Sequence, residues 1–225
     1  MWEAGPGVTI LGAGLETPAI AGKAPTDLPP TRYFPGVGLV SLHMALGDGP
    51  NDAHFLMHSD PYGAVSHGHA DQNAFTLEAY GEALAIASGY YPWYGSDHHR
   101  LWQWESKSSN TITLDGGIGQ VVRDANSRGA ITAYVPAAHY DYVVGDATAA
   151  YQGRLTKAVR SVIHVRPGIF VLFDDVAAPQ PSTIEWNLHA LSAMQLDEPF
   201  QTVTLAQGKA RCRVRFFYGD NLRFN

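Results

Sequence analysis

The chain has 225 residues, of which 45% are hydrophobic and only 16% charged, and its formal net charge is -6 at pH 7. This composition is ample for a packed core, and the acidic balance argues against general nucleic-acid binding, which depends on clustered positive charge. No apolar run approaches the ~18 residues that a membrane span needs. The single cysteine, Cys212, excludes an intramolecular disulfide framework, and its strand-like surroundings indicate a packing role.

The first 35 residues are rich in proline and glycine, a composition that resists helix and sheet. We therefore expect residues 1–35 to be a linker or wrapped arm and residues 36–225 to be one β-domain. The N-terminus has no basic leader followed by an apolar stretch, so it does not resemble a signal peptide. A strand-like run near residue 215 stands close to the last residue, and we expect the domain to be truncated at its C-terminal end.

Alternation of apolar and polar residues with a period of two recurs along the chain and predicts half-buried strands. It begins at Val40, Leu42, Met44 and Leu46 and returns at Phe75, Leu77 and Ala79. Later examples are Ile112 and Leu114; Ile131, Ala133 and Val135; Tyr140, Tyr142 and Val144; Ile184, Trp186 and Leu188; and Cys212, Val214 and Phe216.

Turn signals separate these strands. Pro167-Gly168 lies between two strand-like runs and predicts a hairpin, and Asp115-Gly116-Gly117 predicts another turn. Residues 97–104 can form one short turn of helix with its aromatic side chains inward, and no stretch predicts a long helix. Many short strands with few helices predict an all-β fold, an antiparallel β-sandwich or supersandwich.

The most informative motif is His67-Gly68-His69, which is followed by Asp71 and other polar residues just before the strand that starts at Phe75. In extended backbone two imidazoles two residues apart point to the same side. Histidine titrates near neutrality and is the commonest metal ligand, so the pair can hold a metal, move a proton, or divide these tasks. We expect this motif at the mouth of a strand.

Three segments around this motif resemble, in order and spacing, the C-terminal β-domain of heparinase II/III-type polysaccharide lyases. They are residues 62–75 (YGAVSHGHADQNAF), 81–91 (GEALAIASGYY) and 110–116 (NTITLDG), with looser similarity at 33–38 and 186–189. The resemblance implies cleavage of uronic-acid-containing polysaccharides, such as heparan sulfate, another glycosaminoglycan or alginate, by β-elimination. It also implies a preceding helical toroid domain and a secreted or periplasmic location.

The resemblance assigns the catalytic or charge-neutralising imidazole to His67 and a structural zinc ligand to His69. Relatives supply the other zinc ligands from an acidic residue and a histidine, at positions that are Ala87 and Ser109 here. The metal site is therefore lost or rebuilt. A rebuilt site, for zinc or another divalent metal such as manganese, would recruit His98 or His99.

β-Elimination needs a base, neutralisation of the uronate carboxylate and protonation of the departing oxygen. Tyr94, beside Gly95 in a polar loop, is the tyrosine best placed to assist His67. The side chains expected to contact the substrate are Arg100, Trp102, Trp104, Lys107 and Asn110. Because the substrate is expected to bind between toroid and sandwich, the chain alone should be weakly active or inactive.

Two alternatives stay open from the residues. A cupin-like metal enzyme also begins with His-x-His, but the first acidic residue in the following strand, Glu78, is too distant to join the pair. A carbohydrate-contacting or structural module without catalysis is the stronger alternative. The polar row of Glu185, Asn187 and His189 on a predicted strand is expected to face solvent or a groove.

Overall fold

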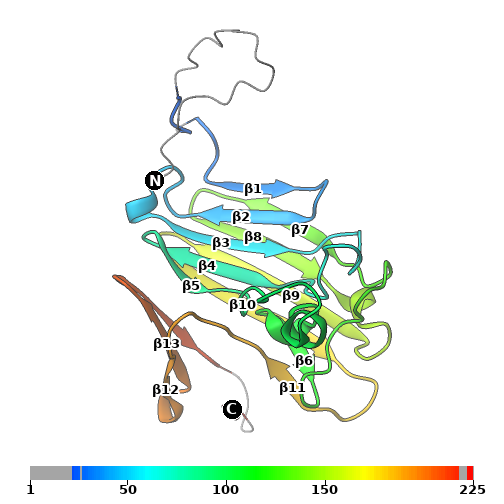
Figure 1. Ribbon diagram of the computed structural model, residues 1–225. Coiled ribbons are helices and arrows are strands. Elements are labelled where there is room, and N and C mark those ends of the chain that lie inside the picture. The colour runs from blue at the N-terminus through cyan, green and yellow to red at the C-terminus, as the bar shows by residue number, and fades with distance from the viewer. Residues whose placement is uncertain (1–21, 26, 218–221, 225) are drawn as a thin grey trace, which may run out of the picture.

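The computed structural model describes residues 22–25, 27–217 and 222–224. Within this part the chain forms antiparallel strands, short 3-10 turns and a π-helix, so the predicted all-β fold is confirmed (Figure 1). None of the described helices has the length and apolar character needed to cross a membrane.

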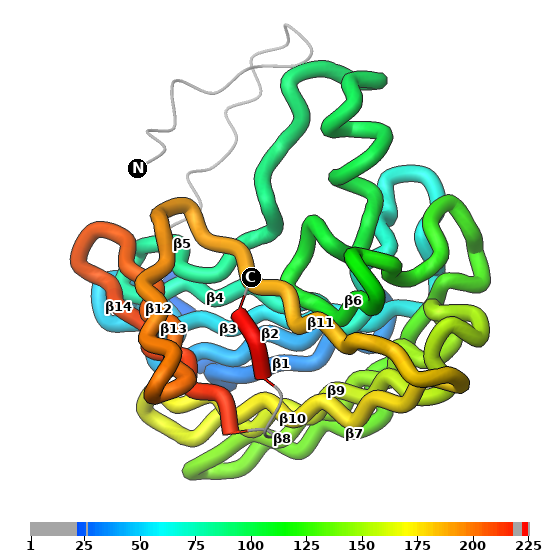
Figure 2. The backbone as a smooth tube through the Cα atoms, turned by 90° about the horizontal axis from the view of Figure 1, so that it is seen from below, coloured from blue at the N-terminus to red at the C-terminus, as the bar shows by residue number. Residues whose placement is uncertain are grey.

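Two large sheets form the sandwich. The five-stranded sheet runs in chain order through β1 (Thr31–Phe34), β2 (Leu39–His43), β3 (Ala53–His58), β4 (Phe75–Ala79) and β5 (Glu82–Ala85). The four-stranded sheet has the order β10 (Ile169–Ala177), β9 (Lys157–Val165), β8 (Tyr140–Asp146) and β7 (Ala130–Pro136). Figure 2 shows these sheets as two stacked layers.

Smaller elements complete the described chain. A two-stranded sheet pairs β11 (Ile184–Trp186) with β6 (Ile112–Leu114), and a three-stranded sheet has the order β12 (Gln195–Asp197), β13 (Thr202–Gln207) and β14 (Ala210–Arg215). The 3-10 turns are η1 (Gly49–Asn51), η3 (Ser106–Ser108), η4 (Thr148–Tyr151) and η5 (Glu198–Phe200). The π-helix η2 (His99–Gln103) lies in the predicted helical turn over 97–104.

The core lies between the two large sheets. Alternate residues of β2 and β3, such as Leu42 and Phe55, are almost fully buried and share one hydrophobic cluster with Val143 of β8 and Val162 of β9. The period-two pattern therefore identified the buried face of the first sheet, because side chains alternate across a strand. Cys212, half-buried, packs against the same cluster.

The first sheet begins within the expected arm. β1 pairs antiparallel with β2 and so belongs to the sandwich, although it lies in the proline-rich stretch. Residues 1–21 of the arm lie outside the described residues.

In β8 the apolar-looking face is the outer one. Tyr140 is exposed and Tyr142 half-buried, whereas Asp141 and Val143 are fully buried. The Asp141 carboxylate can lie inside because Arg166 donates a hydrogen bond to it at 2.7 Å, and buried charges persist where they are paired.

The expected turns are present. The Pro167-Gly168 hairpin joins β9 to β10 in continuous antiparallel register, and the Asp115-Gly116-Gly117 turn links Leu114 to Ile118 through a bridge. Both confirm the turn signals of the sequence.

The polar row on β11 and the residues after it is partly buried rather than fully open to solvent. Glu185 accepts a hydrogen bond from the Thr113 hydroxyl at 2.7 Å, and the Asn187 amide donates to the same hydroxyl at 3.0 Å. The His189 ring bonds to the Lys107 carbonyl oxygen at 2.9 Å. The row instead fastens this stretch to β6 and the segment before it.

Candidate functional site

Two segments meet at one end of the five-stranded sheet. The first, here called the histidine loop (residues 59–74), connects β3 to β4; the second, the aromatic segment (residues 88–105), follows β5. The backbone N–H of Ala70 donates to the Trp104 carbonyl at 3.1 Å, and the His69 ring lies edge-on to Trp104 at 5.3 Å between centroids. Figure 2 shows the aromatic segment projecting from the five-stranded sheet on the side away from the four-stranded sheet.

The histidine pair lies in a turn, where the sequence predicts extended backbone. Ser66 has a left-handed φ of 57°, and the Gly68 N–H donates to the Val65 carbonyl at 2.9 Å. A Cβ at position 68 would lie 2.9 Å from the Gly63 carbonyl oxygen, so the site requires glycine there. His67 is exposed at the tip, and His69 is partly buried against Trp104.

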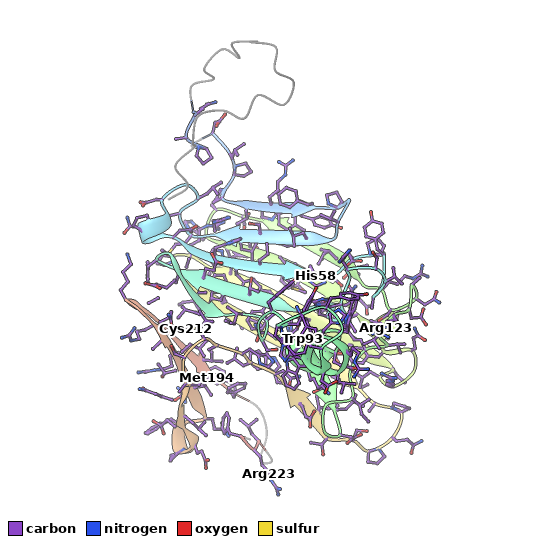
Figure 3. The ribbon with its side chains drawn as sticks, viewed as in Figure 1. His58, Trp93, Arg123, Met194, Cys212 and Arg223 are labelled. Carbon is purple, nitrogen blue, oxygen red and sulfur yellow. The ribbon has the colours of Figure 1, made fainter. Side chains whose placement is uncertain are left out.

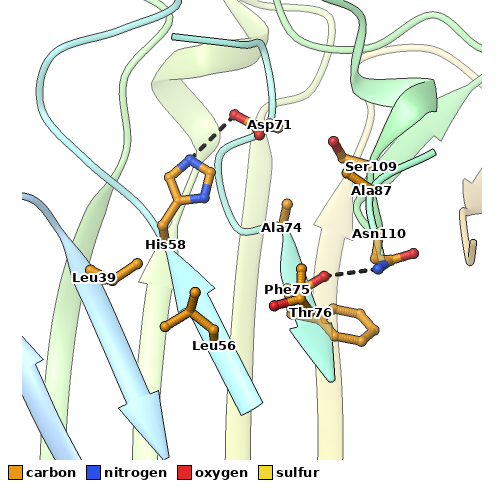
Figure 4. A pocket seen from close by; sticks show the side chains of 10 residues that line it. All are labelled: Leu39, Leu56, His58, Asp71, Ala74, Phe75, Thr76, Ala87, Ser109 and Asn110. Carbon is orange, nitrogen blue, oxygen red and sulfur yellow. Dashed lines mark hydrogen bonds and ion pairs between the residues drawn. The ribbon is translucent and has the colours of Figure 1, made fainter. Parts of the chain in front are cut away.

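A third histidine, which sequence reasoning missed, closes the base of this loop. His58 ends β3, and its Nε2 lies 3.3 Å from Asp71 Oδ1 and 3.7 Å from Asp60 Oδ2. Figure 4 shows the contact with Asp71. The sequence offers only a histidine at the end of a strand as a signal. Asp71, its nearer partner, stands at the far end of the loop, so no local pattern joins the two.

The electrostatics of this cluster favour the ionised pair. Burial alone would lower the pKa of His58, but the carboxylates of Asp71 and Asp60 outweigh it, and the pKa is raised. Burial likewise opposes ionisation of Asp71, yet the charge and hydrogen bond of His58, together with the charge of His69, hold its pKa below the usual value.

A small pocket of about 90 Å³ opens beside this pair. Its lining includes His58, Asp71, Ala87, Ser109 and Asn110 (Figure 4). Asn110 is almost fully buried, and its amide nitrogen donates to the carbonyls of Phe75 and Ile86 at 2.8 and 3.0 Å. The amide predicted to contact substrate thus fastens its own segment to β4 and the end of β5.

The imidazole of His99 lies buried in a cage of aromatic rings. Tyr91 and Tyr94 lie 4.5 and 4.6 Å from it, measured between ring centroids. Its Nδ1 accepts from the Gly95 N–H, and its Nε2 faces the Trp104 indole N–H, both at 3.2 Å. A neutral imidazole has a single acceptor nitrogen, so His99 has no lone pair left for a metal.

Two positions expected to supply zinc ligands carry side chains that are not usual zinc ligands. Ala87 and Ser109, at the positions that the resemblance gives to metal ligands, both line the pocket but offer only a methyl group and a hydroxyl. His98 has a buried Nε2 without a hydrogen-bond partner. Across the part of the chain that the structure describes, no three His, Cys, Asp or Glu side chains come together to hold a metal ion.

The other predicted site residues divide between internal contacts and open positions. Tyr94 is 79% exposed, and Arg100 pairs with Asp97 at the surface. The Trp102 indole N–H donates to the Ser88 hydroxyl, and the Lys107 ammonium lies 5.6 Å from the centre of the Trp102 ring.

Arg123 adds a positive charge at the same end of the sandwich. Its guanidinium lies 5.8 Å from the centre of the Trp104 ring, which also contacts His69. Figure 3 shows His58, Trp93 and Arg123 at the end of the sheets where the two segments lie. The exposed imidazole of His67, cationic side chains and exposed aromatic rings therefore share one region.

The comparisons with known proteins agree with this architecture. Residues 26–221 match the model of the heparinase II/III-like family, C-terminal domain. The chain belongs to this family. A search of curated proteins gave no match.

Solved structures show the same fold for this heparinase II/III-like domain. A heparinase III, the BT4657 gene product, has a TM-score of 0.67 and 19% identity over 77% of this chain and 26% of its own. The heparan sulfate lyase HepC from Pedobacter heparinus has a TM-score of 0.67 and 18% identity over 82% of this chain and 28% of its own. A crystal structure of heparinase III has a TM-score of 0.61, with 23% identity over 79% of this chain and 27% of its own. The chain thus spans about a quarter of the length of these proteins.

Proposed function

We propose that this heparinase II/III-like domain is the β-domain of a lyase that cleaves uronic-acid-containing polysaccharides by β-elimination. The observation that carries the proposal is the exposed His67 on a loop that packs against Trp104 through His69, while the cationic Arg123 lies over the same Trp104 ring. The polymer is heparan sulfate, another glycosaminoglycan or alginate, and a helical toroid domain forms the other wall of the cleft. Such an enzyme acts outside the cytoplasm, in the periplasm or after secretion.

The chemistry assigns each group a task. A base removes the proton on the carbon next to the uronate carboxylate, the neighbouring carbon–oxygen bond breaks, and the departing oxygen takes up a proton, which leaves an unsaturated sugar. His67 serves as base or neutralises the carboxylate, and the exposed Tyr94 assists with the proton. Arg100, Lys107 and Arg123 supply positive charge for carboxylates or sulfates.

A non-catalytic carbohydrate-contacting module is the second candidate. Its support is a set of exposed aromatic rings on the aromatic segment: Tyr90 is 77%, Trp93 67% and Tyr94 79% exposed. Flat aromatic faces present apolar area with little conformational freedom and suit the faces of sugar rings. This module would bind the same polymers without cleaving them.

The test is an ultraviolet assay for the unsaturated product with heparan sulfate, heparin and alginate. It uses the chain alone and the chain joined to its helical domain. We expect His67→Ala to lower kcat by about 100-fold or more, the usual contribution of an acid–base group. The matched control is His139→Ala, an exposed histidine in the turn between β7 and β8. Full activity in His67→Ala would contradict the assignment, and polymer binding without any cleavage would favour the module.

A further inference from the structure

The histidine loop is narrow at its base, where side chains from its two ends meet. The backbone N–H of Asp60 donates to Gln72 Oε1 at 2.7 Å, and the Gln72 amide donates to Asp60 Oδ2 at 3.2 Å. One step closer to the sheet, His58 reaches Asp71. Beyond this neck, the tip that carries His67 and His69 has no strand pairing.

Two carboxylates lie close to the His58 ring at this neck. Asp60 and Asp71 come from opposite ends of the loop, and the Nε2 of His58 is 3.7 Å from one and 3.3 Å from the other. Their side chains are only about a fifth exposed, at 18% and 21%, so water screens their mutual repulsion poorly. A cationic donor beside both carboxylates offsets this repulsion and adds to the two hydrogen bonds between Asp60 and Gln72.

The opposite wall of the adjacent pocket provides no alternative anchor. Ala87 and Ser109 stand there, and neither side chain is a zinc ligand of the usual kind. His99, whose ring nitrogens both face N–H donors, is likewise engaged. Ala87 and Ser109 thus offer no usual zinc ligand, and the ring nitrogens of His99 are already in contact with N–H donors.

We propose that His58 is a positioning residue: its imidazole bridges Asp71 and Asp60, closes the neck of the histidine loop, and holds His67 and His69 in place without a metal ion. The loop is then an internally latched element. Two of its amides report on the latch, because the N–H groups of Gly68 and Ala70 are both hydrogen-bonded when the loop is closed. The catalytic consequence rests on the proposed function; the latch itself does not.

Amide hydrogen exchange at a fixed neutral pH tests the latch. In His58→Ala we expect the amides of Gly68 and Ala70 to exchange at least about tenfold faster, since a hydrogen bond to a charged group is lost. The matched control is His54→Ala, on the same strand and the same face, whose ring bonds to the Ser41 hydroxyl at 2.9 Å instead. This control should leave both amides unchanged.

Further measurements keep the test decisive. Amides of β9 serve as the internal reference, so faster exchange everywhere is separated from opening of the loop. His58→Arg, which can reach both carboxylates through its forked donors, should restore slow exchange. The proposed latch is contradicted if His58→Ala leaves the exchange rates of the two amides unchanged. It is also contradicted if His58→Arg folds but does not restore slow exchange.

A metal-removal experiment and an activity assay complete the design. Treatment of the wild-type chain with EDTA should not change exchange of the two amides; accelerated exchange, together with stoichiometric zinc in protein purified without chelator, would overturn the proposal. In the lyase assay, His58→Ala should lower kcat with little change in KM, and His58→Arg should recover it. Absence of lyase activity in every variant would contradict the proposed function and leave the exchange result to decide the latch.

Discussion

Replacing Arg160 with methionine gives a quantitative test of how the second sheet supports the site. The Arg160 side chain is 1% exposed and donates to Asp174 at 2.7 and 3.0 Å, and to the carbonyl oxygens of Asn73 and Asn110 at 2.8 and 2.9 Å. Asn73 ends the polar run of the histidine loop, and Asn110 lines the pocket. One side chain therefore ties β9 to the histidine loop and to the Asn110 wall of the pocket.

Truncating one member of a buried ion pair costs about 3–5 kcal/mol of unfolding free energy, because a charge remains without its partner. Asp174 keeps a hydrogen bond from the Trp186 indole N–H at 2.9 Å, and its side chain is 16% exposed. We therefore expect Arg160→Met to lower the unfolding free energy by about 3 kcal/mol, near the lower end of this range. The double variant Arg160→Met with Asp174→Asn should recover about 1 kcal/mol or more, since the unpaired charge is gone.

Urea unfolding at pH 7, followed by tryptophan fluorescence, measures these changes. The matched control is Lys157→Met, which breaks the Lys157–Asp175 pair on the same two strands, where the side chains are 49% and 45% exposed. An exposed pair contributes about 0–1 kcal/mol. If Arg160→Met costs no more than this control, the buried pair does not stabilise the sandwich and the reasoning is refuted.

Three further predictions follow from the packing. Burial lowers the pKa of His164 despite its bond to Asp141. The neutral form therefore stabilises the fold above the unfolded pKa of about 6.5, and this stability is lost as pH falls through the lower folded value. His164→Gln should flatten the decline in unfolding free energy between about pH 7 and 5, and exposed His139→Gln should not. A Cβ at Gly145 would lie 2.2 Å from Asn73 Oδ1, so Gly145→Ala should cost about 1–3 kcal/mol in the same urea assay, and an unchanged midpoint would contradict the packing. Burial raises the pKa of Tyr151 to about 12, and a phenol absorbance titration that shows it ionising near pH 10 with the fold intact would disprove this environment.

The strands and the family were accessible from the sequence because they depend on neighbouring residues. Alternation with a period of two predicted β2, β4 and β6 to β8, and Pro167-Gly168 predicted the β9–β10 hairpin. β1 was hidden in a proline-rich stretch, and β12 has only three residues, so both depend on pairing with a neighbouring strand. The histidine pair stood out because its chemistry lies in consecutive residues.

Only the tertiary structure decided which polar groups lie inside and which contacts hold the site. Asp141 is buried because Arg166 and His164 of other segments contact it, and no local pattern encodes such partners. His58 and Asp71 likewise meet across a loop. Local periodicity reports which face of a strand is buried, whereas the pairing of distant charges depends on the register and packing of whole sheets. That difference is why the sequence predicted the sandwich and His67, and the fold was needed to find the latch behind them.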